Sequence, residues 1–182
     1  MLRWLTFALI ALCAGPAFSQ TYDREGFVLG GGFSYASENF DESGIDFDDT
    51  GAVDLLGGYR FNSIIGTELR FEQTFDFEGD TPGPDVDVDI WALTGNLQFY
   101  ILTGQFQPYL GGGFGLGEAD VEVHGPGGDD DFSDPVWRLF LGLDSYVNEN
   151  IAIGAEVAYN FGVDDLNDFD YWTMSALFKY RF

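Results

Sequence analysis

Apolar and polar residues alternate along most of the chain with a period of two. This period is typical of strands, whose successive side chains point to opposite faces of a sheet. The clearest case is 172–182, where every second residue is apolar and most of the others are polar, Lys179 and Arg181 included. After residue 20, no apolar run approaches the roughly 20 residues of a membrane-spanning helix. The pattern therefore predicts strands throughout.

The alternation predicts eight strands, at 26–36, 51–61, 64–75, 88–99, 107–117, 136–147, 151–161 and 172–182. The segments 62–63, 100–106 and 148–150 are short, whereas 37–50, 76–87, 118–135 and 162–171 are long. An even number of strands, with short turns at one rim and long loops at the other, is typical of outer-membrane barrels. We therefore predict an all-β fold: an eight-stranded antiparallel transmembrane up-and-down β-barrel, with both termini at the rim of the short turns.

Alternation also fits a soluble barrel or sandwich with an apolar core. The sizes of the side chains on the two faces favour the membrane barrel, because a lumen of eight strands has little room. The apolar face is bulky, with Phe27, Leu29, Phe33, Tyr35, Leu55, Phe114 and Leu116. The opposite face is mostly small, with Gly30, Gly32, Ser34, Gly58, Gly111, Gly113 and Gly154.

The first residues have the pattern of a secretory signal peptide. Arg3 supplies positive charge, 4–14 is mostly apolar, and Gly15 and Pro16 break this run before a site of small residues. We expect cleavage before Gln20, so that 1–19 is the signal peptide and 20–182 is one barrel domain. Cys13 is the only cysteine and lies in the segment to be removed, so we expect no disulfide and no thiolate metal site.

Acidic residues strongly outnumber basic ones, with Asp+Glu 31 against Lys+Arg 7 and a formal net charge of -24. So acidic a surface argues against a nucleic-acid partner. The four long segments are rich in acid and contain no Lys or Arg. Their carboxylates are candidates for binding divalent cations, above all Asp129, Asp130 and Asp131. Their spacing matches no EF-hand loop, and loops kept solvated by charge repulsion are the favoured interpretation.

The polar face of the predicted strands also carries charges, which would point into the lumen. They are Arg60, Glu68, Arg70, Glu72, Arg138, Asp144, Glu156, Lys179 and Arg181. Away from water such ions must be paired and hydrogen-bonded. A network of salt bridges that blocks the lumen is favoured over a gated ion path, because so narrow a lumen is filled by its own side chains.

Enzymatic chemistry finds little support in the sequence. His124 is the only histidine and lies in the stretch HGPGG of a long segment, without an evident Ser or Asp partner. The glycine runs at 30–32 and 111–113 lie in predicted strands with no following helix, so they do not fit a nucleotide-binding loop. We expect no catalytic residue and no cofactor.

Three stretches resemble the outer-membrane β-barrel superfamily of eight-stranded proteins, which includes the OmpA-type transmembrane domain and the OmpX-like barrels of the porin family. They are GGYRFNSIIGTELRFEQ at 57–73, QPYLGGGFGLG at 107–117 and the ending ALFKYRF. The family's last strand has alternating apolar residues with Tyr third from the end and Phe last, which Phe178, Tyr180 and Phe182 match. The resemblance implies that these three residues form the signal read by the barrel-assembly machinery.

The resemblance also implies a place in the outer membrane of a Gram-negative cell, in contact with lipid and lipopolysaccharide, with both termini in the periplasm. We expect a small integral outer-membrane protein whose structural or surface-interaction role is carried by acidic extracellular loops. A narrow channel for ions or small solutes stays open as the alternative. A lipid-modifying outer-membrane enzyme is a third, less favoured candidate.

Overall fold

The computed structural model describes residues 22, 24–38, 46–47, 49–75, 77–80, 86–123, 130–162 and 170–182. The long strands in these ranges are β1 (Gly26–Glu38), β3 (Thr50–Arg60), β4 (Ile65–Thr74), β6 (Val86–Tyr100), β7 (Phe106–Val123), β8 (Asp130–Tyr146), β9 (Ile151–Gly162) and β10 (Tyr171–Arg181). Two short strands, β2 (Asp46–Phe47) and β5 (Phe77–Asp80), pair with each other, and β5 also pairs with β6. A search of the same ranges for a helix with membrane-spanning length and hydropathy finds none.

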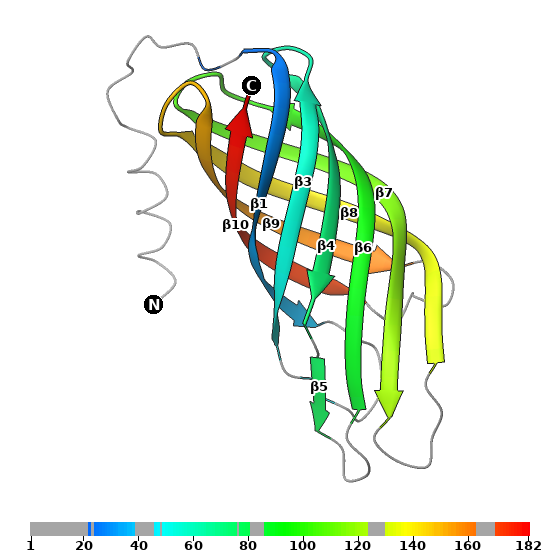
Figure 1. Cartoon of the computed structure of the whole chain (residues 1–182). Coiled ribbons are helices and arrows are strands. Elements are labelled where there is room, and N and C mark those ends of the chain that lie inside the picture. The colour runs from blue at the N-terminus through cyan, green and yellow to red at the C-terminus, as the bar shows by residue number, and fades with distance from the viewer. Residues whose placement is uncertain are drawn as a thin grey trace.

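The eight long strands form a closed antiparallel barrel (Figure 1). They are hydrogen-bonded in the order β6-β4-β3-β1-β10-β9-β8-β7, and β6 pairs with β7 to complete the ring. Each strand therefore lies beside its neighbours in sequence, and the first and last strands meet along a register from Val28↔Arg181 to Glu38↔Tyr171. Closure leaves the barrel wall without a free edge. The predicted up-and-down barrel is confirmed.

Short turns connect the strands at one end, which we call the short-turn rim. Two of these turns use the same chemistry, because an asparagine side chain accepts hydrogen bonds from backbone amides two and three residues later. Asn62 Oδ1 accepts from the amides of Ile64 and Ile65 at 2.8 and 2.9 Å. Asn148 Oδ1 accepts from those of residues 150 and 151 at 2.9 and 2.8 Å. β1 begins and β10 ends at this same rim (Figure 1).

At the opposite end, the long-loop rim, β6, β7 and β8 run well beyond the remaining strands (Figure 1). Here the sequence prediction was wrong, because it placed 118–123, 130–135 and 86–87 in loops. Two stretches here alternate acidic residues with valine: 86–89 reads Val-Asp-Val-Asp, of which 88–89 was predicted as strand, and 120–123 reads Asp-Val-Glu-Val. The third stretch, 130–135, reads Asp-Asp-Phe-Ser-Asp-Pro. The period of two and the β-branched valines favour strand despite the acid. We call residues 86–89, 118–123 and 130–135, together with β5, the acidic extension.

The polarity of the inward and outward faces of the strands is reversed where the acidic extension begins. On the barrel wall, outward side chains are apolar and exposed, as are Phe114 and Trp137 at 65% and 48%. Nearer the long-loop rim, the inward residues Ile90, Ala119 and Val136 are apolar and buried, while the outward positions between them carry Asp89, Glu118 and Ser133. A wall that is apolar outside fits lipid, and one that is polar outside fits water. The exchange therefore marks one boundary of the apolar belt.

Candidate functional site in the barrel lumen

The structure places every charge that the sequence assigned to the lumen on the inner face of the barrel. Arg60, Glu68, Arg70, Glu72, Arg138, Asp144, Glu156, Lys179 and Arg181 are all buried. It adds Asp54 of β3, which the sequence analysis missed and which is 2% exposed. Asp54 lies six residues before Arg60 in the same strand, so the period of two puts both on one face. This alternation along the strand could have identified Asp54 as a residue of the lumen.

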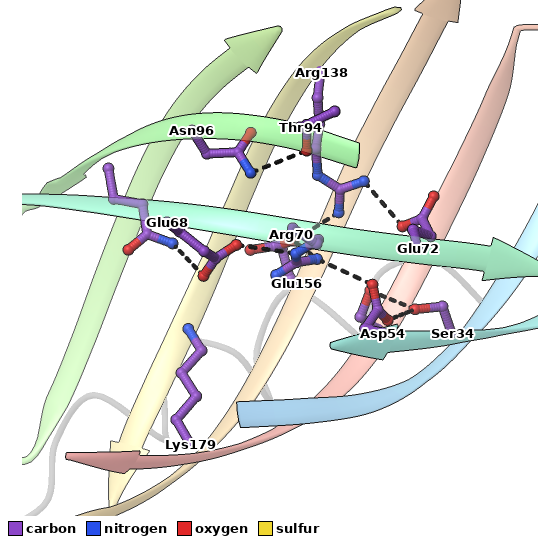
Figure 2. A network of polar contacts seen from close by, with 12 residues as sticks. Ser34, Asp54, Glu68, Arg70, Glu72, Thr94, Asn96, Arg138, Glu156 and Lys179 are labelled. Carbon is purple, nitrogen blue, oxygen red and sulfur yellow. Dashed lines mark hydrogen bonds and ion pairs between the residues drawn. The ribbon is translucent and has the colours of Figure 1, made fainter. Parts of the chain in front are cut away.

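Arg70 lies at the centre of the network and contacts three carboxylates (Figure 2). Its Nη1 donates to Glu156 Oε1 at 2.7 Å, and its Nε donates to Glu68 Oε1 at 2.9 Å. The distance from the same Nη1 to Asp54 Oδ1 is 3.5 Å. Asp54 also accepts a hydrogen bond from the Ser34 hydroxyl. Arg70 therefore joins acids from β3, β4 and β9.

Arg138 extends the network toward the opposite wall (Figure 2). Its Nη1 donates to Glu72 Oε2 and its Nη2 to Glu156 Oε1, both at 3.0 Å. One oxygen of Glu156 therefore accepts from both arginines. Glu72 Oε1 in turn accepts from the Tyr171 hydroxyl at 2.8 Å. These carboxylates are held by charged and neutral donors together, as buried ions require.

A second layer lies between this network and the short-turn rim. Lys179 Nζ is 2.9 Å from Asp144 Oδ1. It also donates to the Tyr109 hydroxyl at 3.3 Å, and this hydroxyl donates to Glu156 Oε2 at 2.8 Å. Tyr109 thus connects the two layers. Nearest the rim, Arg60 donates to the carbonyls of residues 62 and 63 at 3.0 and 2.6 Å and lies over the Tyr100 ring at 3.8 Å.

The buried charges of the described residues balance. The acids are Asp54, Glu68, Glu72, Asp144 and Glu156, and the bases are Arg60, Arg70, Arg138, Lys179 and Arg181, so five negative charges offset five positive ones. An unbalanced buried charge would cost several kcal/mol. These ten buried charges therefore cancel, although the whole chain carries a net charge of -24.

Large aromatic side chains also fill the lumen, which the sequence analysis did not expect from a face of small residues. Tyr100, Tyr109 and Phe140 form a buried cluster with Ala158. Glycines on neighbouring strands make room for them: a Cβ at Gly111 would collide with the Phe140 ring, and one at Gly142 with the Tyr109 ring. The internal cavity between Arg60, Glu68 and Lys179 has room for about one water molecule. A larger groove is lined mainly by outward apolar side chains such as Leu97, Phe114 and Leu139, so it belongs to the outer wall.

The three residues of the proposed assembly signal face outward on the last strand. Phe178, Tyr180 and Phe182 are 53%, 40% and 66% exposed, and the rings of Tyr180 and Phe182 meet edge to face at 5.0 Å. They alternate with the buried Lys179 and Arg181.

The structure tests the acidic segments only in part. Asp129 and His124 lie outside the described residues, and Asp130 and Asp131 are described as the backbone that begins β8. The ranges that are described hold no group of three or more His, Cys, Asp or Glu side chains placed to bind a metal ion. At the long-loop rim, the hydroxyl of Tyr35 donates to Asp49, and this hydrogen bond lowers the pKa of the Asp49 carboxyl.

Backbone register in the acidic extension pairs acids with acids. Asp89 of β6 lies opposite Asp120 of β7, and Asp120 lies opposite Asp131 of β8. Asp87 is likewise opposite Glu122. Like charges at directly opposite positions of an antiparallel pair destabilise it. The extension is therefore a sheet whose own charges oppose its pairing.

A barrel with an apolar outer wall, a neutral ionic lumen and an aromatic last strand is the architecture of outer-membrane proteins. The sequence matches the outer membrane protein β-barrel domain family over residues 5–182. The chain belongs to this family. Because family members lie in the outer membrane of Gram-negative bacteria, the apolar wall of this outer-membrane barrel faces lipid.

Solved outer-membrane barrels share its fold. Neisserial surface protein A superposes with a TM-score of 0.70 at 17% identity, over 86% of this chain and 97% of that one. Ail of Yersinia pestis, the attachment invasion locus protein, gives 0.63 at 24% identity over 87% and 100%. OprG of Pseudomonas aeruginosa gives 0.61 at 19% identity over 90% and 99%. Ail has also been solved with the heparin analogue sucrose octasulfate. No curated protein sequence matches the outer-membrane barrel significantly.

Proposed function

We propose that the protein is a closed, non-enzymatic outer-membrane barrel whose acidic extension contacts cations or basic partners outside the cell. The observation that carries the proposal is the row formed by Asp89, Asp120 and Asp131 across three strands. Acids at directly opposite positions destabilise strand pairing, and positive charge supplied from outside would relieve this. Divalent ions, a basic protein surface or ions shared with lipopolysaccharide phosphates would supply it.

The lumen supports a structural role for the barrel rather than conduction. Its five acids and five bases neutralise one another, and aromatic rings occupy the space beside them. An ion crossing the barrel would have to break several charge-assisted hydrogen bonds at once. We expect no steady conductance when the purified protein is inserted into planar bilayers. A stable open level of defined size would refute the closed lumen and favour the channel.

The proposed orientation has the short-turn rim and both termini in the periplasm, with the acidic extension outside. It can be tested with single cysteines and an impermeant maleimide on intact cells. Ser133→Cys, on the extension, should react, whereas Asn62→Cys, in a short turn, should react only after the cells are opened. The reverse pattern would invert the barrel.

The charge of the extension predicts which ligands it excludes. Ail binds a polysulfated heparin analogue, but in this chain the segments 76–87 and 118–135 contain no Lys or Arg. A polyanion would be repelled by the acidic charge of these segments. We therefore propose a preference opposite to that of a heparin-binding surface, for cationic ligands.

Asp120 is the residue whose replacement tests this proposal most directly, because it has an acid on each side. Asp120→Asn should raise the unfolding temperature at low ionic strength and reduce the further rise caused by millimolar calcium. Replacing Asp129, Asp130 and Asp131 together by Asn should act in the same direction. Glu25→Gln is the control, since Glu25 is an exposed acid at the opposite rim.

Sodium chloride at matched ionic strength separates binding from screening. Simple screening has a range of about 10 Å at 0.1 M salt and does not depend on the identity of the cation. Calcium should therefore protect the wild type more than sodium does, and protect Asp120→Asn less. If both salts act equally on both proteins, the extension binds no divalent ion.

Lipid-modifying activity is the remaining alternative. In the described lumen, acids are held by arginine or lysine. His124, the only histidine of the sequence, lies outside the described residues. We expect lipid A mass spectra from cells with and without the protein to be identical. A difference of one acyl chain between them would refute the non-enzymatic assignment.

A further inference from the structure

We propose that the mouth of the barrel at the short-turn rim is a binding site for the chain's own N-terminal segment, with Tyr22 as the residue that closes the lumen from this side. The inference rests on contacts at the rim opposite to the acidic extension. The inference can therefore be tested independently of the surface role proposed above.

Two buried side chains converge on one carbonyl group of this segment. Arg181 Nη1 donates to the Tyr22 carbonyl at 2.5 Å, and Gln107 Nε2 donates to the same oxygen at 3.2 Å. Arg181 and Gln107 are 3% and 0% exposed. They come from β10 and β7, which are not neighbours in the barrel. The Tyr22 carbonyl therefore lies where donors from separate parts of the wall meet.

The Tyr22 side chain is buried as if it belonged to the barrel core. Only 6% of it is exposed, and it forms a cluster with Tyr146 and Ala152. The rings of Tyr22 and Tyr146 stack with centroids 5.4 Å apart and planes 25° apart. The following residues, Arg24 and Glu25, are exposed. Stacked pairs of this kind favour association beyond the area that they bury.

The side chains at the mouth also need the N-terminal segment as a hydrogen-bond partner. Arg181 lies over the Tyr146 ring at 4.5 Å, and its guanidinium donates to the carbonyls of residues 22 and 24 at 2.5 and 3.3 Å. If the segment left, a buried cation would lose these acceptors, which is unfavourable away from water. Outside the mouth, Arg24 Nη1 is 2.6 Å from Glu149 Oε2 and fastens the segment to a short turn. The ring, the carbonyl and this outer ion pair together form a latch.

A thiol placed behind Tyr22 reports whether the mouth is closed. Ala152 is 1% exposed and packs in the same cluster, so Ala152→Cys puts a thiol among the side chains that Tyr22 helps to bury. In a background with Cys13→Ala, this thiol is the only one in the chain. We expect a small charged methanethiosulfonate reagent to react slowly with the folded protein in detergent. Adding Tyr22→Ala should raise this rate at least tenfold.

Two controls separate an opened mouth from a loosened barrel. Ala158→Cys lies deeper, in the cluster with Tyr100 and Phe140, and should stay slow with and without Tyr22→Ala. Phe61→Ala removes an exposed aromatic ring near the same rim and should leave the labelling rate at position 152 unchanged. Heat-modifiable migration on gels verifies that each variant is folded.

Equal labelling rates at position 152 with and without Tyr22→Ala, in two proteins that are both folded, would overturn the proposal. A parallel rise at position 158 would also overturn it, because the whole barrel would then have loosened. If Tyr22→Ala does not fold, Tyr22→Leu, which keeps apolar bulk but loses ring stacking, is measured in its place. Its rate at position 152 should lie severalfold above that of the protein with Tyr22 intact, and an unchanged rate counts against the latch.

Discussion

Glu156 is the carboxylate on which the two arginines of the lumen depend, and its replacement is the sharpest test of the ionic network. Glu156→Ala removes the partner of Arg70 at 2.7 Å, the partner of Arg138 at 3.0 Å and the acceptor of the Tyr109 hydroxyl. It also leaves the buried side chains with one positive charge in excess. Removing one member of a buried pair costs about 3–5 kcal/mol.

Other contacts moderate this loss, so we expect the lower part of that range. Arg70 keeps Glu68 at 2.9 Å, and Arg138 keeps Glu72 at 3.0 Å. The expected loss is therefore about 3 kcal/mol in the free energy of unfolding. Glu156→Gln, which keeps the shape and an acceptor, should lose less, about 1.5 kcal/mol, the lower limit for a hydrogen bond to a charged group.

Urea titration of the barrel in lipid vesicles, followed by gel migration and tryptophan fluorescence, measures these differences. Glu149→Ala is the control, because its ion pair with Arg24 is more than half exposed and should change the stability by less than about 1 kcal/mol. If Glu156→Ala were as stable as Glu149→Ala, the network would not support the fold. An unchanged stability accompanied by new ion conductance would instead favour the channel.

Three further predictions follow from the wall, the lumen and the long-loop rim. Replacing Tyr180 and Phe182 together by Ser should lower the folded yield in the outer membrane and leave signal cleavage unaffected, because the last strand closes the barrel; fractionation and gel migration measure both. Gly142→Leu should prevent folding or displace the aromatic layer, at a cost of about 1–3 kcal/mol or more, measured by urea titration. Tyr35→Phe should raise the pKa of Asp49 toward its ordinary value of 3.8 in an NMR titration. Because the pKa of Asp49 is lowered in the folded state, the hydrogen bond from Tyr35 stabilises the fold above about pH 4, and its contribution fades as the pH falls through the folded pKa. An unchanged pKa of Asp49 in Tyr35→Phe would show that this hydrogen bond does not lower it.

The architecture of the barrel could be predicted because its wall obeys one simple rule. Outward positions from Trp172 to Phe182 are apolar, and a lipid-facing strand admits little else, so the period of two survives in the sequence. The acidic extension was missed because it is rich in acidic residues, and dense charge was taken as evidence of loop. Alternation with valine was the better indicator there, since strand geometry depends on period and side-chain shape.

The sequence could predict which residues face the lumen, but it could not predict which of them contact one another. Parity selects Arg70 and Glu156 for the inner face, but only the stagger of β4 and β9 across the barrel brings them to 2.7 Å. The aromatic filling was hidden for a related reason. Tyr109 and Phe140 fit only where Gly142 and Gly111 stand on the neighbouring strand, and the register between strands is not visible in either strand alone.

The exchange of faces at Ile90, Ala119 and Val136 fixes how deep the protein sits in its membrane. Moving inward would carry the acids at 89 and 118 into hydrocarbon, and moving outward would put the rings at 114 and 137 into water. The barrel therefore has one preferred height. β7 continues to Val123, four residues past Ala119, which corresponds to roughly 10 Å for strands tilted by about 40°. A peptide inserted between β7 and β8 would therefore be displayed at a set distance from the lipid surface, because the projecting ends of both strands continue the barrel wall.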